Sequence, residues 1–345
     1  MRSVDLRSDT TTLPSDEMRQ AIAGSELGDD VFKGDPTVNK LQDLAAQRMG
    51  KEAALLVPSG TMANLVSILT HCGRGAEVIL GNKAHTYKYE KGGISAYGSI
   101  HSTQIPNHDD GTMKLEDIRD AIRGIDDHFP VTKLIGLENT HNVCGGAPLS
   151  VAYTKEVADL ARSHNIKMHI DGARIFNAAV ALGVEVQELV EGADSMSFCL
   201  SKGLGAPVGS VICGSKDFID QARGIRKGLG GGMRQAGIIA AAGIVALETM
   251  VDRLQEDHTN ARLLADGIAG LPGIVLDPES IKTNIIYFDM DDDTLESADF
   301  LVALSTKGIQ FFDTGPRRFR MVTHYGITAE DILYTIDAFK QTLAD

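Results

Sequence analysis

Two stretches, KMHIDGARIFN (residues 167–177) and ADSMSFCLSKG (residues 193–203), decide the expected fold and the position of the expected site. In each, a short apolar run typical of a buried strand ends at a polar cluster, first Asp171 with Arg174 and then Lys202. Ligands of an open α/β sheet bind beyond the carboxyl ends of its parallel strands, so we expect these three side chains to lie close together. Such a set suits pyridoxal phosphate (PLP), because a lysine binds its aldehyde as a Schiff base and a carboxylate pairs with its ring nitrogen.

Strands and helices alternate outward from these stretches. Amphipathic segments at 61–71, 115–123 and 151–164 predict helices between most of the predicted strands. A mainly parallel sheet with helices on both faces follows. The apolar runs that predict its strands lie at 53–57, 76–80, 132–138, 166–170, 195–200 and 208–213.

A second, smaller unit is expected after the glycine run 228–232, which precedes a long apolar helix predicted to start near Met233. Strands are predicted at 283–288, 309–312 and 319–322, with helices at 296–306 and 328–343. We therefore expect three parts, with the second boundary inside the helical region 245–256. They are an N-terminal arm (1–13), a large PLP-binding domain (14–248) and a small C-terminal α+β domain (249–345).

Composition excludes several classes of protein. The chain has 345 residues, 43% of them hydrophobic and 23% charged, which is typical of a globular protein rather than a disordered one. Its formal net charge of -14 argues against nucleic acid or an anionic membrane as a partner. The charged N-terminus has no apolar signal core, and no apolar run reaches the length of a membrane span.

The four cysteines, Cys72, Cys144, Cys199 and Cys213, are scattered without a metal-ligand spacing. We therefore expect reduced, buried cysteines, no metal site and a cytoplasmic protein.

Ser59, Gly60 and Thr61 follow a predicted strand and open a predicted helix. Their backbone N–H groups and hydroxyls could hold a phosphate at the helix N-terminus, although an ordinary N-cap explains the segment at least as well. The segment is neither a Walker loop nor a dinucleotide fingerprint.

Further polar residues stand at the ends of predicted strands. Asp171 and Arg174, taken singly, could be a turn residue and a solvated charge, but Lys202 after a buried strand is better explained by catalysis. His85 and His141 each follow a strand, where histidine could stack on a cofactor ring or move a proton. Arg320 alternates inward on its strand and could bind a substrate carboxylate with its planar fork.

Taken together, these motifs resemble the low-specificity L-threonine aldolase family, which are PLP enzymes of the aspartate aminotransferase-like fold (fold type I). The matching segments cover nearly the whole chain in the family's order. They are residues 5–10, 28–31, 58–62, 138–142, 169–177, 200–204, 230–237 and 322–324.

The resemblance implies how the cofactor is held. Lys202 would carry it, Asp171 would pair with the ring nitrogen, and Arg174 would contact the ring-oxygen side. The segment from Ser59 to Thr61 would hold the phosphate, helped from a neighbouring subunit by two basic residues. These are Lys227 and Arg234.

The resemblance also implies a substrate site. Ser8 and Arg320, together with Arg174, would grip the substrate carboxylate. His85 would stack on the ring, and His85 or His141 would meet the β-hydroxyl.

Two positions depart from the family's usual pattern. Phe32-Lys33-Gly34 stands where a phenol and a carboxylate are common, and Lys88 stands where an aromatic residue is common. Both are expected near the substrate entrance and bear on side-chain preference.

The resemblance implies a lyase of amino-acid metabolism that reversibly cleaves L-threonine, L-allo-threonine and related β-hydroxy-α-amino acids to glycine and an aldehyde. Another PLP reaction, such as β-elimination or transamination, is the alternative, since fold alone does not choose between them. A catalytically silent binding protein would be expected to lose Lys202 or Asp171, and both are present. Because Lys227 and Arg234 would serve a site across an interface, we expect a dimer within a homotetramer.

Overall fold

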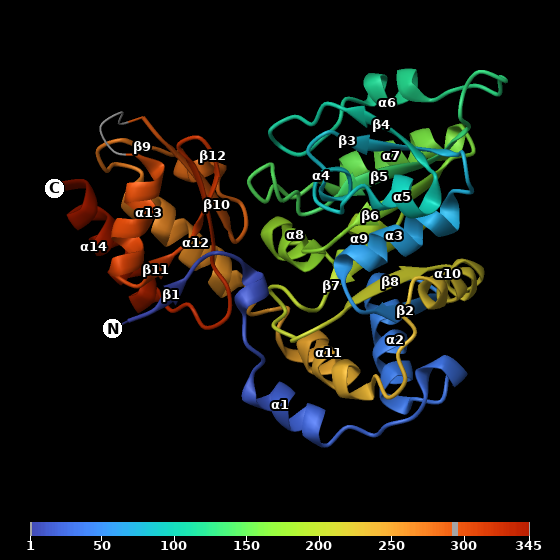
Figure 1. The fold of residues 1–345 in the computed structure, drawn as a ribbon, viewed down its shortest axis with the longest axis horizontal. Coiled ribbons are helices and arrows are strands. Elements are labelled where there is room, and N and C mark those ends of the chain that lie inside the picture. Colours follow the sequence, from blue (N-terminus) through green and yellow to red (C-terminus); the bar gives the residue numbers. More distant parts are fainter. Residues whose placement is uncertain (1, 292–295, 345) are drawn as a thin grey trace.

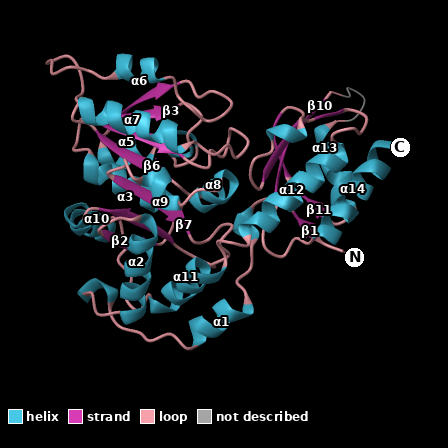
Figure 2. Cartoon of the chain, turned by 180° about the vertical axis from the view of Figure 1, so that it is seen from behind, coloured by secondary structure: helices cyan, strands magenta, loops and turns pink. Residues whose placement is uncertain are grey.

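The computed structural model describes residues 2–291 and 296–344. A large α/β lobe lies beside a smaller lobe that contains both chain ends (Figure 1). Helices cover the central strands of the large lobe on both faces (Figure 2).

A seven-stranded sheet in the order β2-β8-β7-β6-β5-β3-β4 forms the centre of the large lobe. All neighbouring pairs are parallel except the two that involve β8, so the predicted mainly parallel sheet is confirmed. The edge strand β4 was not predicted, because its sequence HSTQI is polar and only its last residue is buried. The strands are Ala53–Val57 (β2), Glu77–Gly81 (β3), His101–Ile105 (β4), Thr132–Glu138 (β5), Lys167–Asp171 (β6), Ser195–Cys199 (β7) and Ser210–Gly214 (β8).

The helices of the large lobe begin at polar caps that the sequence supplies. Ser15, Asp35, Ser59 and Ser150 each accept a hydrogen bond from a backbone N–H of the first turn. The helices are Asp16–Ala23 (α1), Pro36–Met49 (α2), Gly60–His71 (α3), His85–Lys88 (α4), Gly93–Gly98 (α5), Leu115–Ala121 (α6), Val151–Ser163 (α7), Ile175–Leu182 (α8), Val186–Val190 (α9), Lys216–Gly228 (α10) and Gly237–Thr249 (α11), with 3₁₀ turns at Asp9–Thr11 (η1) and Asp30–Phe32 (η2).

The small lobe is built on a four-stranded antiparallel sheet in the order β12-β13-β10-β9. Its elements are Leu254–Ile268 (α12), Ile274–Val275 (β9), Pro278–Ser280 (η3), Ile285–Met290 (β10), Ser297–Thr306 (α13), Ile309–Gln310 (β11), Phe312–Gly315 (β12), Arg318–Val322 (β13) and Ala329–Ala344 (α14). The N-terminal strand Val4–Asp5 (β1) pairs in parallel with β11. Val4 and Leu6 are fully buried, so the predicted arm also belongs to the core of the small lobe.

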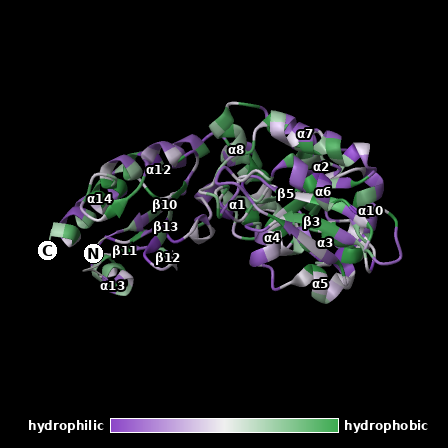
Figure 3. Cartoon of the chain, turned by 90° about the horizontal axis from the view of Figure 1, so that it is seen from above, coloured by the Kyte–Doolittle hydropathy of each residue, from purple (hydrophilic) through white to green (hydrophobic). Residues whose placement is uncertain are grey.

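Each lobe has its own hydrophobic core. The core of the small lobe is centred on packed aromatic rings, among them Phe288, Phe300 and Phe319. In the large lobe, helix α8 is mostly hydrophobic (Figure 3), and the side chains of its first five residues are buried. The domain boundaries at 13/14 and 248/249 stay a prediction.

In the part of the chain that the structure describes, every helix is too short or too polar to cross a membrane.

Candidate active site

Polar side chains gather where the parallel strands of the large lobe end. Asp171 is the last residue of β6, Glu138 is the last residue of β5, and Lys202 follows β7 by three residues. His85 opens α4, which follows β3. The carboxyl ends of the strands therefore bring together the acid, lysine and histidine predicted from separate stretches.

Asn64 on α3 joins two buried carboxylates of this cluster. Its amide nitrogen donates to Asp171 Oδ2 at 2.8 Å and to Glu90 Oε1 at 2.9 Å. Glu90 Oε1 lies 2.9 Å from His85 Nδ1 as well. His85, Glu90, Asn64 and Asp171 thus form one hydrogen-bonded chain at the floor of the site.

The charges of Glu90 and Asp171 make His85 more basic. Burial alone would lower the pKa of His85, but the hydrogen bond to Glu90 and the negative charge of Asp171 raise it above the ordinary value. Burial raises the pKa of Glu90, and the nearby Asp171 acts in the same direction. The result is a histidine made more basic by a carboxylate on its Nδ1 side.

Glu138 ties the loops of both predicted histidines to the sheet. Its Oε2 accepts from the backbone N–H of His85 at 2.6 Å, and its Oε1 accepts from the backbone N–H of Asn142 at 2.8 Å. Among the described residues, neither ring nitrogen of the buried His141 has a hydrogen-bond partner. An unpartnered buried imidazole is unfavourable unless a ligand supplies the partner.

Arg174 is held by Asp9 rather than left open to a ligand. Its Nε and Nη2 donate to the two oxygens of Asp9, each at 2.7 Å, and both residues are buried. Burial alone would raise the pKa of Asp9, but the Arg174 guanidinium, with Lys202 and Arg320 nearby, lowers it well below its usual range. Three of the five N–H donors of Arg174 remain for other partners.

Arg320 lies on the inner side of β13, as predicted, and is 9% exposed. It donates to Asn142 Oδ1 at 2.9 Å and to the carbonyl of Arg7 at 3.3 Å, while its Nε has no partner among the described residues. The adjacent Ser8 begins η1 and accepts from the N–H of Thr10. The N-terminal segment and the small lobe thus supply a hydroxyl and a cation to one side of the site.

The expected phosphate segment does form a helix N-terminus. Ser59 caps α3 by accepting from Met62 N at 3.2 Å, which confirms the N-cap. The N–H groups of Gly60 and Thr61 have no partner within the helix because they belong to its first turn. A Cβ on Gly60 would stand 2.9 Å from Cys199 Sγ, so this helix end approaches the end of β7 too closely for a side chain.

Lys227 and Arg234 lie on either side of the glycine run and are exposed. Arg234 binds Asp29 at 3.0 Å and lies over the ring of Phe32. A Cβ on Gly231 would stand 2.3 Å from Met62 Sδ, so the glycine run passes beside the N-terminus of α3. The two cations are therefore near that helix end, but their described contacts do not reach Lys202.

A pocket of about 710 Å³ lies between the lobes, and Lys88, Tyr89, Tyr287 and Arg318 are among its lining residues. The ring centroids of Tyr89 and His85 are 5.6 Å apart, so the pocket lies next to the site. Lys88 thus lines this pocket, and its place near the substrate entrance stays a prediction. Lys33 instead pairs with Asp220 on α10.

The residues present fit PLP. A helix N-terminus suits its phosphate, Asp171 suits a ring N–H, and Lys202 suits its aldehyde. His85, Glu90 and Asp171 each offer an atom within 4.8 Å of the others, which would also suit a metal ion. The hydrogen bonds through Asn64 explain this clustering without an ion.

Comparisons with known proteins agree with this geometry. The sequence matches the beta-eliminating lyase family over residues 5–291. Low-specificity L-threonine aldolase 1 of Arabidopsis thaliana is 51% identical over 99% of this chain and 97% of its own length. The low specificity L-threonine aldolase of Escherichia coli K12 is 44% identical over 95% of this chain and 96% of its own.

A solved structure of the Leishmania major threonine aldolase superposes with a TM-score of 0.84 over 99% of both chains, at 17% identity. The chain therefore belongs to the beta-eliminating lyase family, and its resemblance to the low-specificity L-threonine aldolases and the expected fold type I architecture are confirmed.

Sequence reasoning missed five residues that complete the site, namely Asp9, Asn64, Glu90, Glu138 and Asn142. Glu138 ends β5 and Asn142 follows His141 in the next loop, so their position was a usable signal. Asn64 faces the sheet one turn after Gly60, where a polar residue in an apolar helix is itself a signal. Asp9 and Glu90 have no comparable signal, because only the fold brings them to Arg174 and His85.

Proposed function

We propose that this protein is a PLP-dependent aldolase that cleaves L-threonine, L-allo-threonine and related β-hydroxy-α-amino acids into glycine and an aldehyde. The observation that carries the proposal is the constellation at one sheet edge: Lys202, Asp171 and the His85–Glu90 pair, faced by Arg320. The aldolase names of relatives that align with nearly all of the chain support it.

The cofactor would be held by residues of three elements. The N–H groups at the start of α3, together with Ser59 and Thr61, would bind the phosphate, Asp171 would bind the ring nitrogen and Lys202 the aldehyde carbon. When bound, PLP supplies an electron sink for the pair left by the broken Cα–Cβ bond. All other tasks fall to the chain's own side chains.

Substrate orientation is assigned to the cations and hydroxyl on the side of the small lobe. Arg320 offers its free Nε, and Ser8 and the remaining N–H groups of Arg174 complete a grip on the carboxylate. Asp9 fixes the guanidinium plane of Arg174 before substrate arrives. A carboxylate held at a fixed angle determines which bond to Cα is aligned for cleavage.

Proton transfer is assigned to the two histidines. Glu90 holds His85 at Nδ1 and raises its pKa, which leaves Nε2 to accept the β-hydroxyl proton directly or through a water held with His141. His141, whose ring nitrogens make no hydrogen bond among the described residues and whose Nε2 lies 4.0 Å from Glu138 Oε2, would hydrogen-bond the hydroxyl. Neither role requires a residue outside the described cluster.

β-Elimination and transamination are the competing reactions on this scaffold. Transamination needs a lysine that moves the proton from the substrate Cα to the cofactor, and Lys202 could do this equally well. His85 and His141, near the carboxylate grip, favour removal of the proton from a β-hydroxyl. Aldol cleavage requires this step and transamination does not.

The protein is further proposed to be a cytoplasmic homotetramer, a dimer of dimers, with an amino acid as its substrate. Lys227 and Arg234 are exposed, so they are accessible to the phosphate of a neighbouring subunit. The four free, buried cysteines support a reducing compartment. Light scattering that finds an active monomer would contradict the assembly.

A substrate panel tests the proposal. The PLP-saturated protein is incubated with L-threonine, L-allo-threonine, L-phenylserine and L-serine, and glycine, aldehyde, pyruvate and ammonia are measured. We expect glycine from the first three and its loss in Lys202→Ala. Pyruvate from L-serine without glycine from L-threonine would support β-elimination instead.

A further inference from the structure

Asp171 is not an isolated carboxylate, because a line of buried polar groups leads away from it between α3 and the sheet. His169 and Asp171 project from the same face of β6, and Ser195 and Ser197 from the same face of β7. The parallel register places His169 beside Ser195 and Asp171 beside Ser197. Asn64 and His71, seven residues apart on α3, cover these four positions.

The contacts form an unbroken chain of five residues. His71 Nε2 lies 2.7 Å from Ser195 Oγ, and Ser195 Oγ lies 2.8 Å from His169 Nδ1. His169 Nε2 lies 3.3 Å from Asn64 Oδ1, and Asn64 Nδ2 lies 2.8 Å from Asp171 Oδ2.

The direction of every proton in the chain can be deduced from its end. The amide nitrogen of Asn64 must face the carboxylates of Asp171 and Glu90, so its Oδ1 can only accept. His169 therefore donates from Nε2, and its neutral ring accepts at Nδ1 from Ser195. The Ser195 oxygen in turn accepts from His71 Nε2, so all donors point towards Asp171.

Both imidazoles are neutral in this arrangement. Burial lowers the pKa of His169 to about 3 and that of His71 to about 4. The chain thus brings aligned dipoles, but no positive charge, to the carboxylate. Aligned hydrogen bonds polarise one another and stabilise the charge at which they point.

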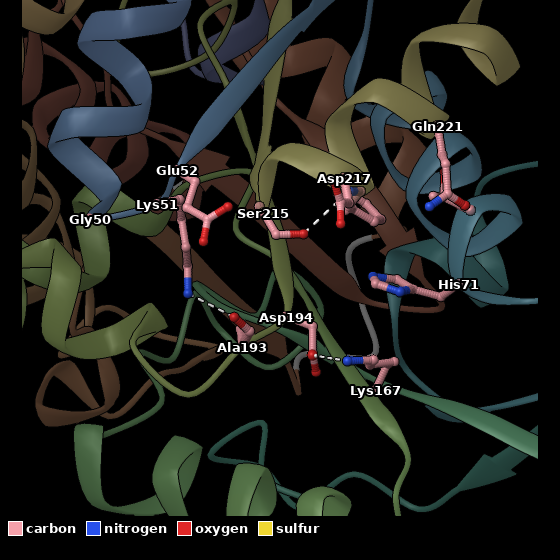
Figure 4. A pocket seen from close by; sticks show the side chains of 13 residues that line it. Gly50, Lys51, Glu52, His71, Lys167, Ala193, Asp194, Ser215, Asp217 and Gln221 are labelled. Carbon is pink, nitrogen blue, oxygen red and sulfur yellow. Dashed lines mark hydrogen bonds and ion pairs between the residues drawn. The ribbon is translucent and has the colours of Figure 1, made fainter.

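The far end of the chain reaches a surface pocket of about 570 Å³ on the other side of α3. The ring of His71 projects into this pocket near Asp194 and Lys167 (Figure 4). It stacks on Phe218, with ring centroids 4.5 Å apart. The first donor of the chain is therefore in reach of water, while the rest is buried.

We propose that Asn64, His169, Ser195 and His71 are positioning residues that orient Asp171 and direct hydrogen-bond dipoles at it, so that it pairs with the ring nitrogen of PLP. This inference rests on the proposed function, because the carboxylate has a task only if the cofactor is bound. The competing explanation is a set of structural polar residues that satisfy one another. Both explanations give the donors the same direction, so variants that remove a single donor are needed to separate them.

Two substitutions of His169 separate these explanations. His169→Gln places an amide N–H near the position of Nε2 and keeps the donor to Asn64. His169→Asn places an amide near the position of Nδ1, which keeps the contact with Ser195 but loses the donor from residue 169 to Asn64, whose Oδ1 then accepts only from Ser197 Oγ at 3.1 Å. Each removes one hydrogen bond, and His169→Asn removes one methylene more than His169→Gln, so a structural role predicts a loss of stability in both variants and no change at the ring nitrogen of PLP.

The measurement is the ¹⁵N chemical shift of ¹⁵N-labelled PLP bound to each variant, recorded by solid-state NMR, together with the PLP dissociation constant. We expect His169→Asn to move the shift towards that of a neutral pyridine and to weaken PLP binding roughly three- to tenfold, the effect of one hydrogen bond. His169→Gln should keep the wild-type shift. Asp171→Asn serves as the reference for a lost carboxylate.

Equal ring-nitrogen shifts in the two His169 variants, at matched urea midpoints, would overturn the proposal. Ser195→Ala should shift the ring-nitrogen signal by a smaller amount in the same direction. No change in Ser195→Ala would show that Ser195 and His71 do not act on Asp171, and would overturn their assignment. These readouts do not depend on aldol cleavage, so failure of the proposed reaction would be seen separately in the wild-type substrate panel.

Discussion

The pairing of His85 with Glu90 leads to a prediction about pH dependence. Glu90→Gln keeps the shape of the side chain and an oxygen that accepts from His85 and Asn64, but it removes the charge. A hydrogen bond to a charged group contributes about 1.5–3 kcal/mol and one between neutral groups about 0.5–1.5 kcal/mol. The loss of roughly 1 kcal/mol of stabilisation of the protonated ring lowers the pKa of His85.

The sign follows from the direction of the shift. Glu90 raises the pKa of His85, and only the deprotonated ring can accept a proton. In Glu90→Gln the pKa of His85 falls, so the acid limb of the profile of kcat/KM against pH moves to lower pH. A weaker base should also lower the plateau of kcat.

The assay is the initial rate of glycine formation between pH 5 and 9, with PLP binding checked at each pH. Glu77→Gln is the matched control, because Glu77 is a buried carboxylate at the opposite end of β3, bound to Thr103 and Thr132. It should change stability without moving the acid limb. An unchanged acid limb in Glu90→Gln, with normal PLP binding, would refute the role of the pair.

The remaining predictions concern the cofactor lysine, the carboxylate grip and the buried ion pair. Lys202→Ala should abolish the visible absorbance of the bound cofactor, and a retained band would contradict its role. Arg320→Lys should raise KM for L-threonine at least tenfold with a smaller change in kcat, because a lysine cannot match the planar fork; an unchanged KM would place the carboxylate elsewhere. Asp9→Asn should lower the free energy of unfolding in urea by about 3 kcal/mol, since Arg174 stays buried without its counter-charge, and a loss below about 1 kcal/mol would count against that pair.

The alternating pattern of strands and helices predicted most of the large lobe. Predicted runs such as 53–57 and 132–138 coincide with β2 and β5, because strands covered on both faces are largely apolar. The antiparallel direction of β8 could not be predicted, since an apolar run carries no sign of its direction. The apolar helix predicted to start near Met233 begins at Gly237, after a turn rich in glycine.

The candidate site was predictable where a residue stands at the end of a strand. Asp171 and His141 are of this kind, and the fold places them at one edge. The partners that adjust their chemistry come from distant segments, as Asp9 does for Arg174. His169 and Ser195 each stand two residues from a second polar residue in an otherwise apolar strand, and this spacing was a usable signal. Single polar residues in strands are more often structural.

The central claim is that the Cα–Cβ bond of a β-hydroxy-α-amino acid is broken. It is tested most directly by incubating the PLP-saturated protein with uniformly ¹³C-labelled L-threonine and following the products by NMR. The account predicts equal amounts of two-carbon labelled glycine and labelled acetaldehyde. Labelled 2-oxobutanoate with ammonia, and no glycine, would show that the Cβ–O bond is broken instead and would contradict it.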